Sequence, residues 1–286
     1  MGFVVVPGRC PGLSNPAPLG LRITFPDSLS VVIGAFLDIG AIPYYSVANS
    51  LAVYFMDFIV AIAAVVMPMT SRLEAGGDFD GLRVMFLKWS KITFSISLMG
   101  GLFLLVLGPR FLAWWIDRSF ERSGGDVLRI LILSHVVFLP MRGMALPVLM
   151  GLGTPGPPTV AFLVAGLFNL GVSIFLVRPY GLAGVVWSTA IANVLFAVAL
   201  LRLTCRELGI PIRDDLGYVG LRPLIGSAPV LGLLLGFLMG LDDRGPWGLL
   251  AVGLAMTAVF ALVWSTFVNR NDRYVRLRFR LKKLIP

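Results

Sequence analysis

Residues 143–177 read GMALPVLMGLGTPGPPTVAFLVAGLFNLGVSIFLV and contain no charged side chain. After Arg178 the chain continues with PYGLAGVVWSTAIANVLFAVALL, residues 179–201, again without a charge. An apolar stretch of about 20 residues forms a helix long enough to cross the roughly 30 Å hydrocarbon core of a bilayer. Soluble domains interrupt such stretches with Lys, Glu or Asp. These two stretches therefore predict membrane-spanning helices.

The composition of the whole chain agrees with a membrane protein. Apolar residues make up 57% of the 286 residues and charged residues 14%, against about 25% charged residues in ordinary globular chains. At about 30 residues per span and loop, the length predicts an all-α polytopic membrane protein with about eight transmembrane helices. The predicted spans are residues 22–38, 43–70, 88–108, 127–151, 157–177, 181–203, 223–241 and 246–268.

The distribution of positive charge predicts the orientation. If both termini are cytoplasmic, the inside segments hold 17 Lys and Arg residues and the outside loops hold 6, which is the bias of the positive-inside rule. The sequence thus predicts a multi-pass protein of the cell inner (plasma) membrane with both termini in the cytoplasm. The outside loop 109–129 is the exception, since it carries Arg110, Arg118, Arg122 and Arg129.

The net charge of +9 is explained by this topology. No basic patch is interleaved with aromatic residues on a polar face, so nucleic acid is not a predicted partner. The basic tail 269–286 predicts attraction to anionic lipid headgroups, with a plain topology anchor as the simpler interpretation. One His and two Cys without ligand spacing predict no metal site. Neither a hydrolytic residue set nor a phosphate-binding glycine loop is present, so we expect neither an enzyme nor a cofactor.

Several phrases of the sequence point to one family. Residues 27–37 read DSLSVVIGAFL, and residues 42–51 read IPYYSVANSL. Residues 66–73 read VMPMTSRL and residues 76–82 read GGDFDGL. Later come LMGLGTP at residues 149–155 and, between Asn169 and Val185, a connection of the form NL…IFLV…YGLAGV. In this order the phrases resemble the polysaccharide and lipid-linked oligosaccharide flippases of the multidrug/oligosaccharidyl-lipid/polysaccharide exporter superfamily.

The resemblance implies a domain organisation. It covers about residues 27–210 and identifies 23–210 as a six-helix lobe, the C-terminal one of the two lobes usual in this family. Residues 211–268 are then two additional transmembrane helices, 269–286 a basic cytoplasmic tail, and 1–22 an atypical, proline-rich segment expected to be disordered. An N-terminal lobe has no counterpart, so we expect a truncated member, with a missing N-terminal lobe or a second copy of the chain as partner.

Ionisable groups inside spans are costly, which makes each a candidate for the substrate path. Arg142 leads, because a guanidinium binds phosphate oxygens in pairs and flippases of this family move polyprenyl-diphosphate-linked sugars. The alternative is that Arg142 pairs with an acid such as Asp57 or extends to the membrane interface. Asp57 either pairs with Arg142 or binds a coupling cation or proton. His135 lies seven residues before Arg142, which predicts the same face of the helix. A lone His inside a helix bundle is, however, more often only a hydrogen-bonded packing residue. Asn169 is either a substrate contact or a hydrogen bond between helices.

Two further residues are predicted to have structural roles. Asp27 is expected to cap a kinked first helix, because its carboxylate can accept backbone N–H groups. Pro140 is expected to bend the fourth span, and such bends are often where transporter helices move.

Together these features favour a flippase that moves lipid-linked oligosaccharide by alternating access. A cation-coupled drug or metabolite exporter of the same superfamily and a non-functional truncated membrane protein remain the alternatives. A membrane enzyme is less favoured, because no acidic or histidine cluster stands out at a membrane face.

Overall fold

A computed structural model describes residues 32–37, 39–240 and 246–268. Within these ranges the regular elements are helices, with no strand, which confirms the all-α prediction. The segment 1–22, Asp27 and the basic tail 269–286 lie outside the described residues. The first predicted span, 22–38, is described only from residue 32, and residues 32–36 are helical.

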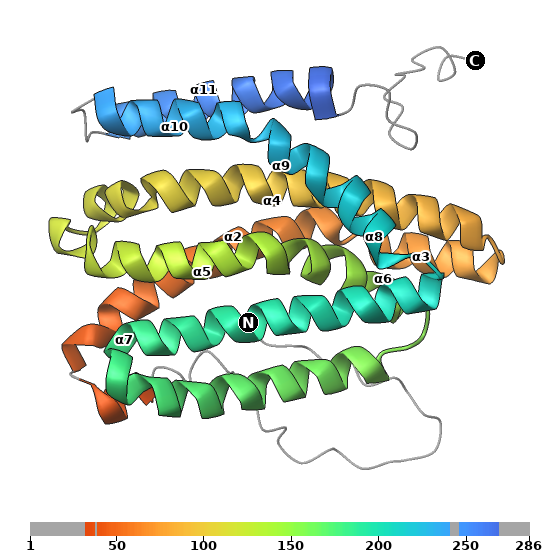
Figure 1. The fold of residues 1–286 in the computed structure, drawn as a ribbon, viewed down its shortest axis with the longest axis horizontal. Helices are drawn as coiled ribbons and strands as arrows, with labels where there is room; N and C mark the ends of the chain where they lie inside the picture. Colours follow the sequence, from red (N-terminus) through yellow and green to blue (C-terminus); the bar gives the residue numbers. More distant parts are fainter. Residues whose placement is uncertain (1–31, 38, 241–245, 269–286) are drawn as a thin grey trace, which may run out of the picture.

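The elements follow one another with short connections (Figure 1). In chain order they are η1 Ile39–Ala41, α2 Ile42–Ala63, α3 Val66–Ala75, α4 Phe79–Trp115, η2 Arg118–Phe120, α5 Ser123–Pro140, η3 Met141–Ala145, α6 Leu146–Gly151, α7 Gly156–Leu208, α8 Ile212–Asp215, η4 Leu216–Leu221, α9 Arg222–Gly226, α10 Ala228–Gly240, α11 Pro246–Val263 and η5 Trp264–Val268. Of the η elements, η1 and η2 are 3₁₀-helices, and η3, η4 and η5 are π-helices.

Six helical stretches in the described ranges are long and apolar enough to cross a membrane. One of them, α7, folds back on itself at Gly181, where φ is 56° and ψ is −136°. A positive φ is readily adopted only by glycine, so Gly181 allows the reversal between the two antiparallel arms seen in Figure 1. Counting both arms, the described structure contains a counterpart for each predicted span from the second to the eighth.

The connections alternate between the two ends of the bundle, as membrane crossings require. At one end, which we call the inner end, Ser71 Oγ donates to the Gly151 carbonyl at 3.2 Å and Arg83 Nε donates to the Leu208 carbonyl at 2.6 Å. At the opposite, outer end, the rings of Tyr44 and Phe120 lie 4.7 Å apart. The segments joined by these contacts are predicted to lie on one side of the membrane, and in the structure they share one end of the bundle. The assignment of the inner end to the cytoplasm stays a prediction.

Helix α5 lies at the centre of the bundle and contacts α2, α4 and α7. One buried apolar cluster fills the inner half of the bundle and includes Leu82, Leu149 and Leu200. A second cluster fills the outer half and includes Tyr45, Leu131 and Val185. Since lipid tails are as apolar as these side chains, such contacts stabilise a membrane bundle through close packing rather than through exclusion of water.

The last two long helices have a core of their own. Val230, Leu234 and Phe237 of α10 pack with Leu249 and Met256 of α11 and with Val106 and Leu107 of α4. Figure 1 shows α10 and α11 on the side of α4 that is remote from α7. This arrangement resembles the predicted pair of additional helices, although the boundary at residue 210 itself stays a prediction.

Helix α4 is longer than the predicted span 88–108. It begins at Phe79 because the Asp78 carboxylate accepts the Gly81 amide at 2.8 Å and so caps the first turn. It runs to Trp115, and its 37 residues correspond to about 55 Å. Hydropathy marks only the part of a helix that suits the bilayer core, so α4 extends beyond that core.

Candidate substrate site

Arg142 and Asp57 come from two elements that are in contact. Asp57 lies near the middle of the apolar stretch Ile42–Ala75, and Arg142 lies in the π-helix η3. Helix α2 packs against η3, and the two half-buried side chains are within electrostatic reach of each other. The structure thus brings together the two ionisable residues that the sequence singled out first.

Gly143 explains how α2 and η3 come so close. A Cβ atom at this position would lie 3.3 Å from Ala63 Cβ and 3.5 Å from Thr93 Cγ2. The missing side chain lets the backbone beside Arg142 approach both α2 and α4. Small residues at such contacts are typical of membrane helix packing.

The π-helical turn begins directly after Pro140, the last residue of α5. Proline has no N–H to donate to the preceding turn, which disturbs the regular helical hydrogen bonds at this point. Turns of π-helix inside α-helices are often found at functional sites. A π-helical turn thus follows Pro140, while the predicted bend at Pro140 and its movement stay predictions.

One oxygen of Asp57 has no hydrogen-bond partner among the described residues, although it is buried. A buried polar atom without a partner is costly and calls for an explanation, such as a bound ion or a ligand. Arg142 makes an interaction of its own in this structure. Arg142 and Asp57 therefore place charge within the spans, and one oxygen of Asp57 can still accept a hydrogen bond.

His135 is buried against its own helix. Its Nδ1 lies 2.7 Å from the Leu131 carbonyl, which requires the proton to be on Nδ1 for a hydrogen bond. The ring meets Phe138 edge-on with centroids 5.8 Å apart. The seven-residue relation to Arg142 assumes a regular α-helix, and the π-helix η3 interrupts that period. His135 is therefore a buried residue that bonds to its own helix. Its role in the substrate path stays untested.

Asn169 lies between the two arms of α7. Its Oδ1 accepts from Ser188 Oγ at 3.0 Å and from Ser173 Oγ at 3.4 Å, and the two hydroxyl groups also contact each other. Asn169 thus joins the arms on either side of the reversal at Gly181. This is the interhelical hydrogen bonding that the sequence offered as one of the two interpretations of Asn169.

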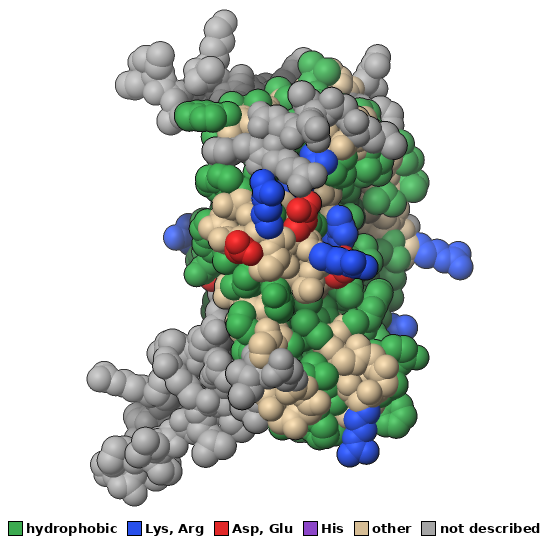
Figure 2. All heavy atoms as spheres, turned by 90° about the vertical axis from the view of Figure 1, so that its left-hand side faces the viewer, with side chains coloured by type: hydrophobic (Ala, Val, Ile, Leu, Met, Phe, Trp, Pro, Cys, Tyr) green, Lys and Arg blue, Asp and Glu red, His purple; other side chains and the backbone are tan. Residues whose placement is uncertain are grey.

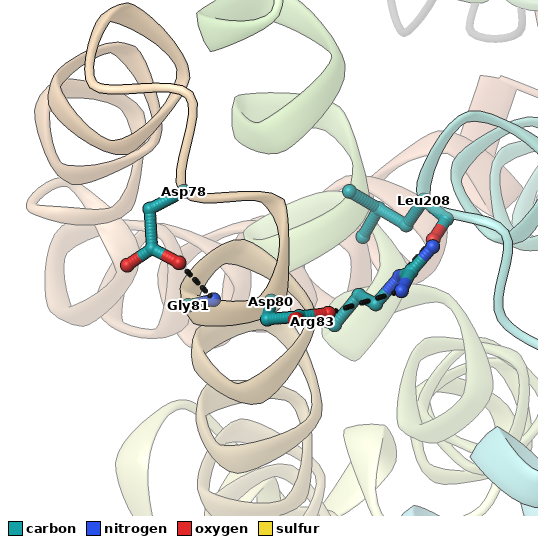
Figure 3. A network of polar contacts seen from close by, with 5 residues as sticks. All are labelled: Asp78, Asp80, Gly81, Arg83 and Leu208. Atoms are coloured by element: carbon teal, nitrogen blue, oxygen red, sulfur yellow. Dashed lines mark hydrogen bonds and ion pairs between the residues drawn. The ribbon is translucent and has the colours of Figure 1, made fainter.

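Three cations of α4 bind the carboxyl ends of other helices. Arg83 Nε donates to the last residue of α7, Leu208, at 2.6 Å (Figure 3). Lys91 Nζ donates to Val268, the last residue of η5, at 2.9 Å, and Arg110 Nη2 donates to Leu238 near the end of α10 at 3.1 Å. The last carbonyls of a helix lack intrahelical donors and attract positive charge, so these cations hold the bundle together.

Figure 3 also shows how the inner turn is ordered around Arg83. Asp78 caps α4 through Gly81, and Asp80 accepts from Arg83 Nη1 at 3.1 Å. Across the turn, Gly209 adopts a φ of 63° and ends α7 with a left-handed residue. Residues of the GGDFDGL stretch therefore cap α4 and bind Arg83 at this end of the bundle.

Two buried ionisable residues were missed by sequence reasoning. Lys91 is buried inside the bundle, with its ammonium group 4.8 Å from the centroid of the Tyr218 ring. Asp215 is buried at the end of α8, just before the stretch that begins at Leu216, and burial raises the pKa of its carboxyl from 3.8 to about 6. Lys91 lies within α4 and Asp215 lies next to the start of a span, and hydropathy does not distinguish an exposed charge from a buried one at either position.

The described residues contain no group of three or more His, Cys, Asp and Glu side chains that could hold a metal ion. Asp27, the predicted cap of the first helix, lies outside the described residues. Contact of Arg142 and Asp57 with a charged substrate stays a prediction.

The described elements form a bundle of helices long and apolar enough to cross a membrane, and comparison with solved structures agrees with such a fold. The chain matches the lipid II flippase MurJ in an inward closed conformation with a TM-score of 0.62 at 18% sequence identity. The match covers 82% of this chain and 50% of the MurJ chain, so the present chain spans half the length of that flippase. No family model and no curated protein sequence matches the chain. The similarity to MurJ shows a flippase-like fold.

Proposed function

We propose that the chain forms one wall of a membrane transporter that translocates a lipid-linked oligosaccharide between leaflets by alternating access. The observation that carries this proposal is the charged pair Arg142 and Asp57, held within the spans of a flippase-like fold. An ionisable pair inside a bundle is expensive to keep and marks a path for polar groups. The similarity to a lipid II flippase supports a lipid-linked substrate.

The chemistry of Arg142 favours a phosphate-bearing headgroup. A guanidinium presents N–H groups in a planar fork that matches phosphate oxygens, and it stays charged inside a protein. A polyprenyl-diphosphate-linked sugar carries such oxygens between its lipid and its sugar. Moving that headgroup through bare lipid is prohibitively costly, so a polar wall must replace the water that it loses.

The second wall of the path would come from a partner. The chain spans half of the flippase that it resembles, and apolar side chains on α2 and α7, such as Tyr54, Phe58 and Phe175, are exposed. In the proposed transporter a second lobe or a second copy of the chain faces these helices. The basic tail 269–286 would add an attachment to anionic lipids at the cytoplasmic surface.

One observation favours the alternative of a cation-coupled exporter. The unpartnered oxygen of Asp57 is a ready acceptor for a cation or a proton. In that case Asp57 would determine the substrate or the coupling ion, and Arg142 would only balance its charge. The two proposals therefore differ in which member of the pair contacts the cargo.

Binding of a polyprenyl diphosphate sugar to the purified chain in nanodiscs tests the proposal. We expect Arg142→Gln to weaken binding by about tenfold or more, because a charge-assisted hydrogen bond to phosphate is lost. Arg142→Lys should weaken it less, and Arg178→Gln is the matched control, since Arg178 stacks on Phe36 at the outer end. Equal affinities of wild type and Arg142→Gln, with a large loss in Asp57→Asn, would favour the cation-coupled exporter.

A further inference from the structure

The outer end of the bundle carries an open depression of about 470 Å³ between α4, η2, α5 and the end of α10. Its charged lining consists of Arg110, Arg118, Arg122, Arg129, Glu121 and Asp126. Figure 2 shows blue and red side chains gathered in the middle of this face, with hydrophobic side chains around them. The volume lies in the range typical of small-molecule sites.

The four arginines of this depression are the four that break the positive-inside pattern. Every arginine of the loop 109–129 is among them. Orientation signals alone would keep such residues out of an outside loop. In the structure all four arginines line one depression. The orientation of the chain in the membrane does not explain this arrangement.

Acidic residues neutralise this cluster only in part. Asp126 pairs with Arg129, whose Nη1 lies 3.3 Å from the carboxylate. The Asp117 carboxylate, next to the cluster in sequence, accepts the Ser119 amide at 2.8 Å and also attracts the neighbouring Arg118. Within the described part of the chain Arg118 and Arg122 make no ion pair, which leaves exposed guanidinium groups beside Glu121.

Arg110 is the least exposed arginine of the cluster and still lacks one partner. Its Nη2 is fixed by the Leu238 carbonyl at 3.1 Å. Its Nη1 is buried and has no hydrogen-bond partner among the described residues. A buried donor on a charged group is costly when unpaired, and an anionic oxygen would satisfy it.

Two tryptophans beside the depression indicate its level relative to the membrane. Trp114 and Trp115 end the same helix and are each 49% exposed, which is typical of aromatic residues at the interface between lipid and water. Phosphate groups of lipid headgroups lie at this level. Arginine clusters bind phosphate through paired hydrogen bonds, which lysine does not form as well.

We propose that this depression is a binding site for a phosphate group, supplied by the headgroup of an anionic lipid in the outer leaflet. The site is separate from Arg142 and Asp57, which lie within the spans, and it does not depend on the proposed transport activity. A lipid bound there would hold η2 and the start of α5 at the membrane surface.

The test measures binding of short-chain phosphatidylglycerol to the purified full-length chain in a neutral detergent. Arg118→Gln combined with Arg122→Gln should weaken binding by about tenfold or more, because two exposed cations are removed. Glu121→Gln should strengthen binding several-fold, since it removes a repelling carboxylate from the lining. A gain in affinity cannot arise from misfolding.

Controls separate this site from its alternatives. Arg178→Gln and the exposed inner-end variant Arg72→Gln should leave phosphatidylglycerol binding unchanged, because neither residue lines the depression or belongs to the proposed transport site. Competition by millimolar inorganic phosphate would show that free phosphate is also a ligand of the same arginines. Unchanged affinity in both the double arginine variant and Glu121→Gln would overturn the proposal.

Discussion

Replacing Asp215 with Asn should stabilise the protein in a pH-dependent way. Both carboxylate oxygens of Asp215 are buried without a hydrogen-bond partner among the described residues. Burial disfavours the charged form and raises the pKa of the carboxyl from 3.8 to about 6. At neutral pH the folded chain therefore carries an unfavourable buried charge.

The magnitude follows from the difference between the two pKa values. Because the folded pKa is the higher one, the folded state holds the proton more tightly than the unfolded state. Below pH about 4 both states are protonated and there is no penalty. Stability is lost as the pH rises from about 4 to about 6 and stays constant above that, and the total loss is about 3 kcal/mol at about 1.4 kcal/mol per pKa unit.

Thermal unfolding of the purified protein between pH 4 and pH 8 measures this effect. Asp215→Asn should match wild type near pH 4 and exceed its unfolding midpoint by on the order of 5 °C at pH 7.5. Glu74→Gln is the control, because it removes an exposed carboxylate at the same end of the bundle. A constant difference between Asp215→Asn and wild type at all pH values would refute the reasoning.

Three further predictions concern the bundle. Arg83→Met should lower the free energy of unfolding by about 1–2 kcal/mol, because the carboxyl end of α7 at Leu208 loses its charged donor. Denaturant unfolding measures this loss, with the exposed variant Arg72→Met as the control. Asn169→Leu should cost on the order of 1 kcal/mol through the lost bonds between the arms of α7, and intact stability with impaired lipid binding would instead assign Asn169 to the substrate path. Reporters fused after Gly77 and after Gly209 should both be cytoplasmic, and a periplasmic signal from either would contradict the predicted orientation.

Much of the fold could be predicted because apolar stretches and turn residues act locally. The charge-free stretch 143–177 indicated the end of one helix, a turn and a second helix. The structure contains that turn between Gly151 and Gly156, with Gly153 at a φ of 70°. The ends of α4 were placed less well, because its cap at Asp78 lies in a polar turn that hydropathy does not register.

The site was harder to predict because it depends on contacts between distant segments. Sequence reasoning selected Arg142 and Asp57 as costly charges, and the structure places them within electrostatic reach. It could not show that His135 bonds to its own helix or that Lys91 binds the end of η5. It counted the arginines of the loop 109–129 as an exception, and only the fold shows that they line one depression.

The central claim is that Arg142 contacts the headgroup of a lipid-linked substrate during transport. The most direct measurement is the rate at which a fluorescent polyprenyl diphosphate sugar crosses the bilayer of proteoliposomes that contain the chain with its transport partner, or the chain alone if a second copy suffices. We predict that Arg142→Gln lowers this rate at least tenfold at equal protein incorporation, that Arg142→Lys retains part of it, and that Arg178→Gln retains all of it. An unchanged rate in Arg142→Gln would contradict the claim.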